Sequence, residues 1–181
     1  MTFANYVDEI EKCLEPCCTI VEESSDFTPG NWTETIKKLL GDLGKRLGYK
    51  VCASTWDKKY NSEWLYDLVW YRENDEEYLV EVPLVVECEW GTNTKKHIKF
   101  DFEKLLLAKA GIKLMICSNN DIKSKEYLAY FRDAIDVCPL VNSNELFLVA
   151  ILKLNGKDAE GFEFYKLYKN SSELGASAPA Q

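Results

Sequence analysis

Residues 78–90, Tyr-Leu-Val-Glu-Val-Pro-Leu-Val-Val-Glu-Cys-Glu-Trp, decide the fold that this sequence predicts. Every second residue from Tyr78 to Trp90 is apolar, which is the period of a β-strand that buries one face. Glu87 and Glu89 lie on the opposite face of the same strand. Acidic residues within such an apolar strand draw attention to this segment as a candidate functional site.

A second apolar segment, residues 64–71, precedes it and reads Trp-Leu-Tyr-Asp-Leu-Val-Trp-Tyr. The polar residues 72–77 join the two segments, so we expect a β-hairpin. Asp67 lies in the middle of the first segment, with Leu65 and Val69 on its own face. A carboxylate inside an apolar strand is costly to bury unless a partner compensates it.

The expected hairpin brings Asp67 and Glu87 close to each other across the strand pair. Two like charges at that separation raise each other's pKa unless a cation lies between them. A hard divalent ion such as Mg²⁺, bound by one or two carboxylates and water, suits such a pair. The pattern therefore predicts a metal site on these two strands.

The remaining apolar periodicity predicts a chain that alternates between helices and strands. Helices are expected at residues 2–15, 31–47, 97–110 and 121–137, and further strands at 49–56, 112–117, 145–154 and 162–168. Asn31 is expected to cap its helix with Glu34 in a capping-box position, and residues 19–30 are expected to be a connector. A helix followed by the short strand 112–117 implies a crossover connection in a parallel or mixed sheet.

Composition bounds the class of protein. A chain of 181 residues suits one domain, expected over residues 1–170, with a small and polar tail at 171–181 that is expected to be disordered. No apolar run is long enough to cross a bilayer and no signal peptide is evident, so a cytoplasmic protein without a membrane partner is expected. Seven scattered cysteines without a C-x-x-C pair, and the single histidine His97, argue against structural zinc.

The net charge of −8 disfavours strong non-specific binding to nucleic acid. A local basic patch is nevertheless expected just after the acidic strand, and it consists of Lys95, Lys96, Lys99, Lys104 and Lys109. The sequence contains no Gly-rich phosphate loop and no nucleophile motif of the G-x-S-x-G type.

The order helix, strand, acidic hairpin, helix, strand over residues 31–118 resembles the core of the PD-(D/E)XK nuclease superfamily, the restriction-endonuclease-like fold. Asp67 matches the aspartate of the second core strand, Glu87 matches the acidic residue of the third, and Cys88 takes the variable position after it. Residues 100–106 match the helix behind the site. The resemblance implies an α/β (α+β) fold with a mixed β-sheet flanked by helices and a core order α-β-β-β-α-β. An extra N-terminal helix, and a C-terminal helix with a β-hairpin, would complete it.

The resemblance also implies Mg²⁺- or Mn²⁺-dependent hydrolysis of a phosphodiester, with the ion held by Asp67, Glu87 and the backbone carbonyl of Cys88. Such sites place a lysine two residues after the glutamate, but here that residue is Glu89. Glu89 would hold a second ion or accept a proton from water. Lys104, on the following helix, is the expected substitute for the lysine, and Lys95 and Lys96 are further candidates.

Structural readings of the same residues remain open. Asp67 would then be satisfied by a backbone amide or a lysine, Glu87 and Glu89 would face solvent, and Lys104 would be a solvated helix residue. The corresponding functional alternative is a non-catalytic binding or assembly module that keeps the fold. Its acidic balance would suit a basic protein partner or an inhibitor that mimics nucleic acid, and a homodimer is a further alternative.

Overall fold

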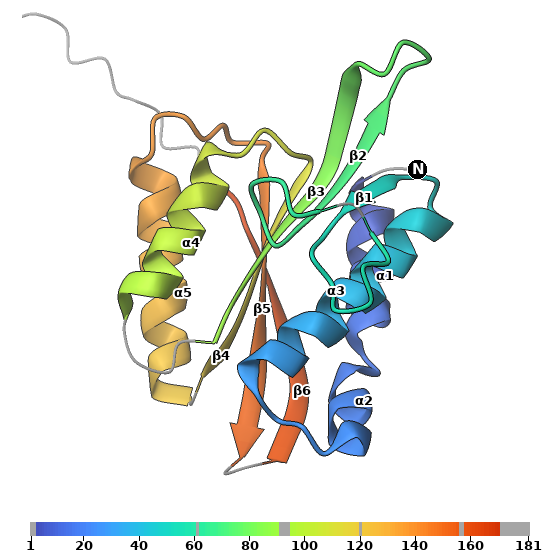
Figure 1. The fold of residues 1–181 in the computed structure, drawn as a ribbon. Coiled ribbons are helices and arrows are strands. Elements are labelled where there is room, and N and C mark those ends of the chain that lie inside the picture. Colours follow the sequence, from blue (N-terminus) through green and yellow to red (C-terminus); the bar gives the residue numbers. More distant parts are fainter. Residues whose placement is uncertain (1–2, 61, 91–94, 120, 156–157, 171–181) are drawn as a thin grey trace, which may run out of the picture.

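A mixed sheet of six strands lies between two layers of helices (Figure 1). The computed structural model describes residues 3–60, 62–90, 95–119, 121–155 and 158–170. The helices are α1 (Phe3–Leu14), α2 (Cys17–Ser24), α3 (Pro29–Arg46), α4 (Lys95–Leu107) and α5 (Asp121–Val137). The strands are β1 (Lys50–Cys52), β2 (Leu68–Glu73), β3 (Leu79–Glu89), β4 (Ile112–Asn119), β5 (Leu146–Asn155) and β6 (Asp158–Leu167).

The strands lie in the sheet in chain order, from β1 at one edge to β6 at the other. Strands β1, β2 and β3 form an antiparallel meander, and β5 pairs with β6 in the same way. The pairs β3–β4 and β4–β5 are parallel because α4 and α5 serve as the crossover connections between them. The predicted mixed sheet flanked by helices, its central hairpin and its crossover are therefore confirmed.

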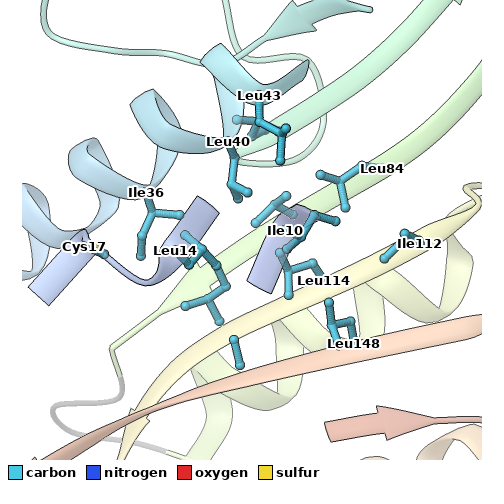
Figure 2. Close-up of a cluster of buried hydrophobic side chains, with 14 of the residues drawn as sticks. Ile10, Leu14, Cys17, Ile36, Leu40, Leu43, Leu84, Ile112, Leu114 and Leu148 are labelled. Carbon is cyan, nitrogen blue, oxygen red and sulfur yellow. The ribbon is translucent and has the colours of Figure 1, made fainter. Parts of the chain in front are cut away.

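Each face of the sheet is covered by its own group of helices. Helices α1, α2 and α3 cover one face, where the alternate residues Leu84 and Val86 of β3 are fully buried (Figure 1). Figure 2 shows this side of the core, in which leucine and isoleucine side chains from α1, α3, β3, β4 and β5 meet. Helices α4 and α5 cover the other face, against Val85 and its neighbours. Because both faces are buried, the structure leaves no solvent-facing side for the middle of β3.

Two predictions about the N-terminal region are wrong. Part of the expected connector at residues 19–30 is helix α2, for which Pro16 is the N-cap residue. Helix α3 starts at Pro29, and Thr28 is its N-cap, with a side-chain oxygen that accepts a hydrogen bond from the amide of Asn31. Asn31 is therefore inside the helix. The predicted end of this helix at Gly48 is confirmed by a left-handed φ of 85°.

Strand boundaries also differ from those predicted. The expected strand at residues 49–56 is only three residues long, and Asp67 precedes β2 instead of lying inside it. The predicted helix 121–137 is found with the same bounds, whereas α4 begins two residues before His97. None of the described helices is both long and apolar enough to span a bilayer. The tail predicted at residues 171–181 lies outside the described residues.

Helix α3 lies very close to β2 because glycine faces the strand. A Cβ atom built on Gly44 would lie 2.5 Å from Nε1 of Trp70, whose side chain is fully buried. The same indole N–H donates a hydrogen bond to the carbonyl of Leu40 at 3.0 Å. This contact fixes the distance between α3 and β2, the strand that follows Asp67.

We expect Gly44→Ala to destabilise the protein by about 1–3 kcal/mol, because the added methyl group overpacks the contact with Trp70. Urea unfolding followed by circular dichroism measures the change. Gly30→Ala is the matched control, because its Cβ would meet nothing closer than 3.8 Å and lies in the same helix. Equal stability of the two variants would contradict the close contact.

Candidate active site

Asp67 lies immediately before β2 and is hydrogen-bonded to the neighbouring strand. Its Oδ2 accepts the backbone N–H of Cys88 at 2.8 Å. The pairing of β2 with β3 begins at Leu68, opposite Val86, so the Asp67 side chain takes over the next position of the ladder. The amide of Cys88 bonds to the side chain of Asp67 and not to its backbone. For this reason β2 begins at Leu68 and Asp67 lies outside it.

Glu87 is buried in β3 on the face covered by α4 and α5. Only 3% of the residue is exposed, so the reading in which it faces solvent is wrong. The β2–β3 pairing ends at Leu68 opposite Val86, one residue short of both acids. Burial raises the pKa of Glu87, and the charge of Asp67 adds to this effect.

Helix α4 supplies a cation to Glu87. Nζ of Lys104 lies 2.5 Å from Oε1 of Glu87 and 3.3 Å from Oδ1 of Asp101, one turn earlier on the same helix. The contact with Glu87 is an ion pair without hydrogen-bond geometry, and Oε1 has no hydrogen-bond donor among the described residues. The predicted substitute lysine, Lys104, therefore reaches the acidic strand.

A second lysine, from the opposite helical layer, contacts Asp67. Lys37 of α3 is only 6% exposed, and its Nζ lies 3.2 Å from Oδ1 of Asp67 and 2.5 Å from Oε1 of Glu63. Burial alone would lower the pKa of Lys37, but the hydrogen bond to Glu63 and the charge of Asp67 raise it. Each of the two carboxylates among the predicted metal ligands thus has its own ammonium partner, and the lysines come from different sides of the sheet.

The other predicted residues lie around this centre. Glu89 is half-buried on the same face as Glu87, and its charge raises the pKa of Asp101. Lys96 is exposed, and the side chain of Lys95 lies outside the described residues. Glu34 is 4% exposed, and its carboxylate accepts a hydrogen bond from the amide of Trp56 at 3.0 Å. It therefore anchors the segment after β1 and does not cap α3.

Burial dominates the electrostatics of the acidic pair. It raises the pKa of Glu87 to about 8, because Lys104 offsets only part of the cost and Asp67 and Asp101 add to it. Burial also raises the pKa of Asp101. The pKa of Lys104 is raised as well, because Glu87 outweighs the effect of burial. Burial therefore favours the neutral form of Glu87, whereas the ammonium of Lys104, 2.5 Å away, favours its carboxylate.

The donor set suits a hard cation. Mg²⁺ binds one or two carboxylates and completes its shell with water, so Asp67, Glu87 and the carbonyl of Cys88 are sufficient ligands. Oε1 of Glu87 already lies 2.5 Å from the ammonium of Lys104, so a metal ion at this oxygen would take the place of that lysine. Within the described residues, no group of three or more His, Cys, Asp or Glu side chains is arranged to hold a metal. A metal here would therefore depend on water and on the backbone.

Lys37, Asp101 and Glu63 were not predicted from the sequence as residues of this site. One signal for Lys37 was present, because Lys37, Gly41 and Gly44 follow one line along α3, where glycine allows close packing. A lysine on such a line is buried and requires a carboxylate partner. Glu63 lies in the irregular segment before β2, where residue spacing gives no information about contacts.

A comparison of the chain with protein-family models, curated proteins and solved structures found no match. The case for a function therefore depends on the geometry of the acidic pair and its lysines.

Glu87→Gln is expected to flatten the pH dependence of stability in EDTA. The pKa of Glu87 rises from 4.5 to about 8 on folding, so the folded chain retains a proton that the unfolded chain releases. Stability must then fall between these two pH values, by a few kcal/mol in order of magnitude. The stability of Glu87→Gln lacks this fall.

Urea unfolding at a series of pH values measures the effect. Glu160→Gln, at an exposed position of β6, is the control and should follow the wild type. Parallel curves for the wild type and Glu87→Gln would show that Glu87 titrates normally.

Proposed function

We propose that this protein is a Mg²⁺-dependent nuclease of the PD-(D/E)XK type. The observation that carries the proposal is the acidic pair at the start of β2 and in β3, where the backbone amide of Cys88 positions Asp67 and a buried Glu87 faces Lys104. A buried carboxylate with a raised pKa beside a lysine, as at Glu87, is typical of catalytic centres. The antiparallel meander followed by a helical crossover to a parallel strand supports the same assignment.

Asp67, Glu87 and the backbone carbonyl of Cys88 would hold the ion. Mg²⁺ bound there supplies a Lewis acid for the phosphate and lowers the pKa of an attacking water. Glu89, on the same face of β3, supplies a carboxylate that accepts a proton from water. These residues come from one strand and from the end of its neighbour, so the sheet itself holds them in place.

Lys104 takes the role that position 89 cannot fill. A carboxylate at Glu89 does not stabilise the negative charge that develops on phosphate, whereas the ammonium of Lys104 does. This ammonium already lies beside Glu87 and is one-third exposed, so it is accessible to a substrate. Lys37 is buried behind Asp67 and positions that carboxylate.

The non-catalytic alternative has its own supporting observation. Both acids already have ammonium partners, Lys37 for Asp67 and Lys104 for Glu87, so their charge is compensated without a metal ion. A fold that retained these pairs for stability alone would act as a binding or assembly module. Its acidic surface would then select a basic protein partner.

We expect the wild type to nick supercoiled plasmid DNA in the presence of Mg²⁺ or Mn²⁺. Asp67→Asn and Glu87→Gln should each lower the rate at least about 100-fold, because loss of even an outer-shell partner of a metal ligand costs 10–100-fold. Isothermal titration with Mn²⁺ should give heat for the wild type and none for these two variants.

Asp133→Asn is the control, because this aspartate is exposed on α5, away from the acidic pair. Nicking that is equally fast in the wild type and in Asp67→Asn would remove Asp67 from the mechanism. A wild type without Mn²⁺ heat would favour the non-catalytic module.

Lys104→Met should lower the turnover rate about 100-fold while the Mn²⁺ affinity changes little, because the ammonium stabilises charge on the substrate. Lys99→Met, on an exposed part of the same helix, should behave as the wild type. A loss of metal affinity in Lys104→Met that matches the loss of rate would instead assign Lys104 to the metal site.

A further inference from the structure

A cavity of about 240 Å³ lies beside the candidate active site. It is lined by Cys52, Ser62, Glu63, Trp64, Tyr71 and Glu73. Cys52 and Tyr71 also belong to the sheet face that α4 and α5 cover, which is the face of Glu87. The cavity and Glu87 therefore lie on the same face of the sheet, whereas Asp67 contacts Lys37 of the opposite helical layer.

The walls of the cavity suit a flat aromatic ligand. Trp64 and Tyr71 lie with ring centroids 5.9 Å apart and planes tilted by 58°, so Tyr71 supports the indole from one side. Trp64 is nevertheless 51% exposed, so much of its indole is accessible to a ligand. An indole that is supported in this way and remains accessible is a stacking platform for a heterocycle.

The polar groups of the cavity accept hydrogen bonds. Glu63 and Glu73 contribute two carboxylates, and one oxygen of each is paired with an ammonium, that of Lys37 and that of Lys50. Among the described residues, the second oxygen of each carboxylate has no partner. Because each carboxylate is already paired with an ammonium group, its second oxygen is an acceptor for an N–H donor of a ligand.

Guanine has the matching chemistry. Its Watson–Crick edge carries an imino N1–H and a 2-amino group, which are adjacent donors for a carboxylate. Adenine and cytosine offer only an amino group on that edge, and thymine offers only an imino group. In a base pair these groups are occupied, so only an unpaired guanine presents them.

One ammonium connects this cavity to the acidic pair. Lys37 contacts Glu63 at the cavity and Asp67 at the candidate metal site. We propose that the cavity binds an unpaired guanine next to the scissile phosphate, so that the substrate is a single-stranded or locally unpaired nucleic acid. This inference rests on the proposed nuclease function and names its substrate class.

Binding of fluorescein-labelled DNA heptamers in EDTA tests the proposal without cleavage. Each heptamer is oligo(dT) with one central dG, dA, dC or deoxyinosine. Fluorescence anisotropy should give at least about tenfold tighter binding for dG than for dA or dC. Deoxyinosine, which keeps the N1–H but lacks the 2-amino group, should lie between them.

Two variants locate the effect. Trp64→Ala should weaken binding of every heptamer, and Glu73→Gln should reduce the preference for dG by about tenfold while leaving the Lys37–Glu63 contact intact. Trp56→Ala is the control, because this tryptophan is 66% exposed and does not line the cavity. Circular dichroism confirms that each variant is folded.

The proposal is overturned by equal affinity for the four heptamers, by no measurable binding of any of them, or by a dG preference that survives Glu73→Gln. Tetramethylammonium binding that depends on Trp64, without base preference, would make the cavity an ammonium pocket. Because these measurements contain no metal ion, their failure leaves the Mg²⁺-dependent nicking of plasmid unaffected. Failure of nicking would likewise leave the base preference intact.

Discussion

The cost of burying the carboxylate of Glu87 is the constraint on which the rest of the candidate site depends. Glu87 is 3% exposed on a strand whose two faces are both covered by helices, and its pKa is raised to about 8. A buried acid of this kind requires a cation or a proton. The fold supplies Lys104 from α4 and places Asp67 immediately before the neighbouring strand, so the charge of Glu87 is balanced by a lysine or removed by a proton.

Strand pairing positions the residues around Glu87. The pairing of Leu68 with Val86 fixes the register of β2 against β3. The hydrogen bond from the amide of Cys88 fixes the position of the Asp67 carboxylate. On the face of the sheet that α3 covers, Gly44 allows this helix to lie against Trp70, which brings Lys37 within reach of Asp67. Cations therefore reach the two acids from both layers of the molecule, and the same ammonium of Lys37 extends the network to the cavity at Glu63.

Period-two alternation in residues 78–90 and helical periodicity elsewhere were sufficient to predict the hairpin, the crossover, α5 and the buried face of α4. They were also sufficient to select Lys104, whose ammonium contacts Glu87, because this contact follows from helix order. Asp67, expected inside the first strand of the hairpin, lies just before it. Lys37, Glu63 and the early start of α3 were not predictable in this way. They depend on the irregular segment between β1 and β2 and on an N-cap at Thr28, where side-chain hydrogen bonds rather than periodicity decide the backbone path.

The central claim is that Asp67 and Glu87 bind one divalent ion between them. The most direct measurement is a crystal structure of the protein soaked in Mn²⁺, with anomalous data collected to locate the metal. The account predicts one anomalous peak in contact with both carboxylates, with Lys104 moved away from Oε1 of Glu87. Crystals that show no peak there, with Lys37 and Lys104 still in contact with the two acids, would contradict it.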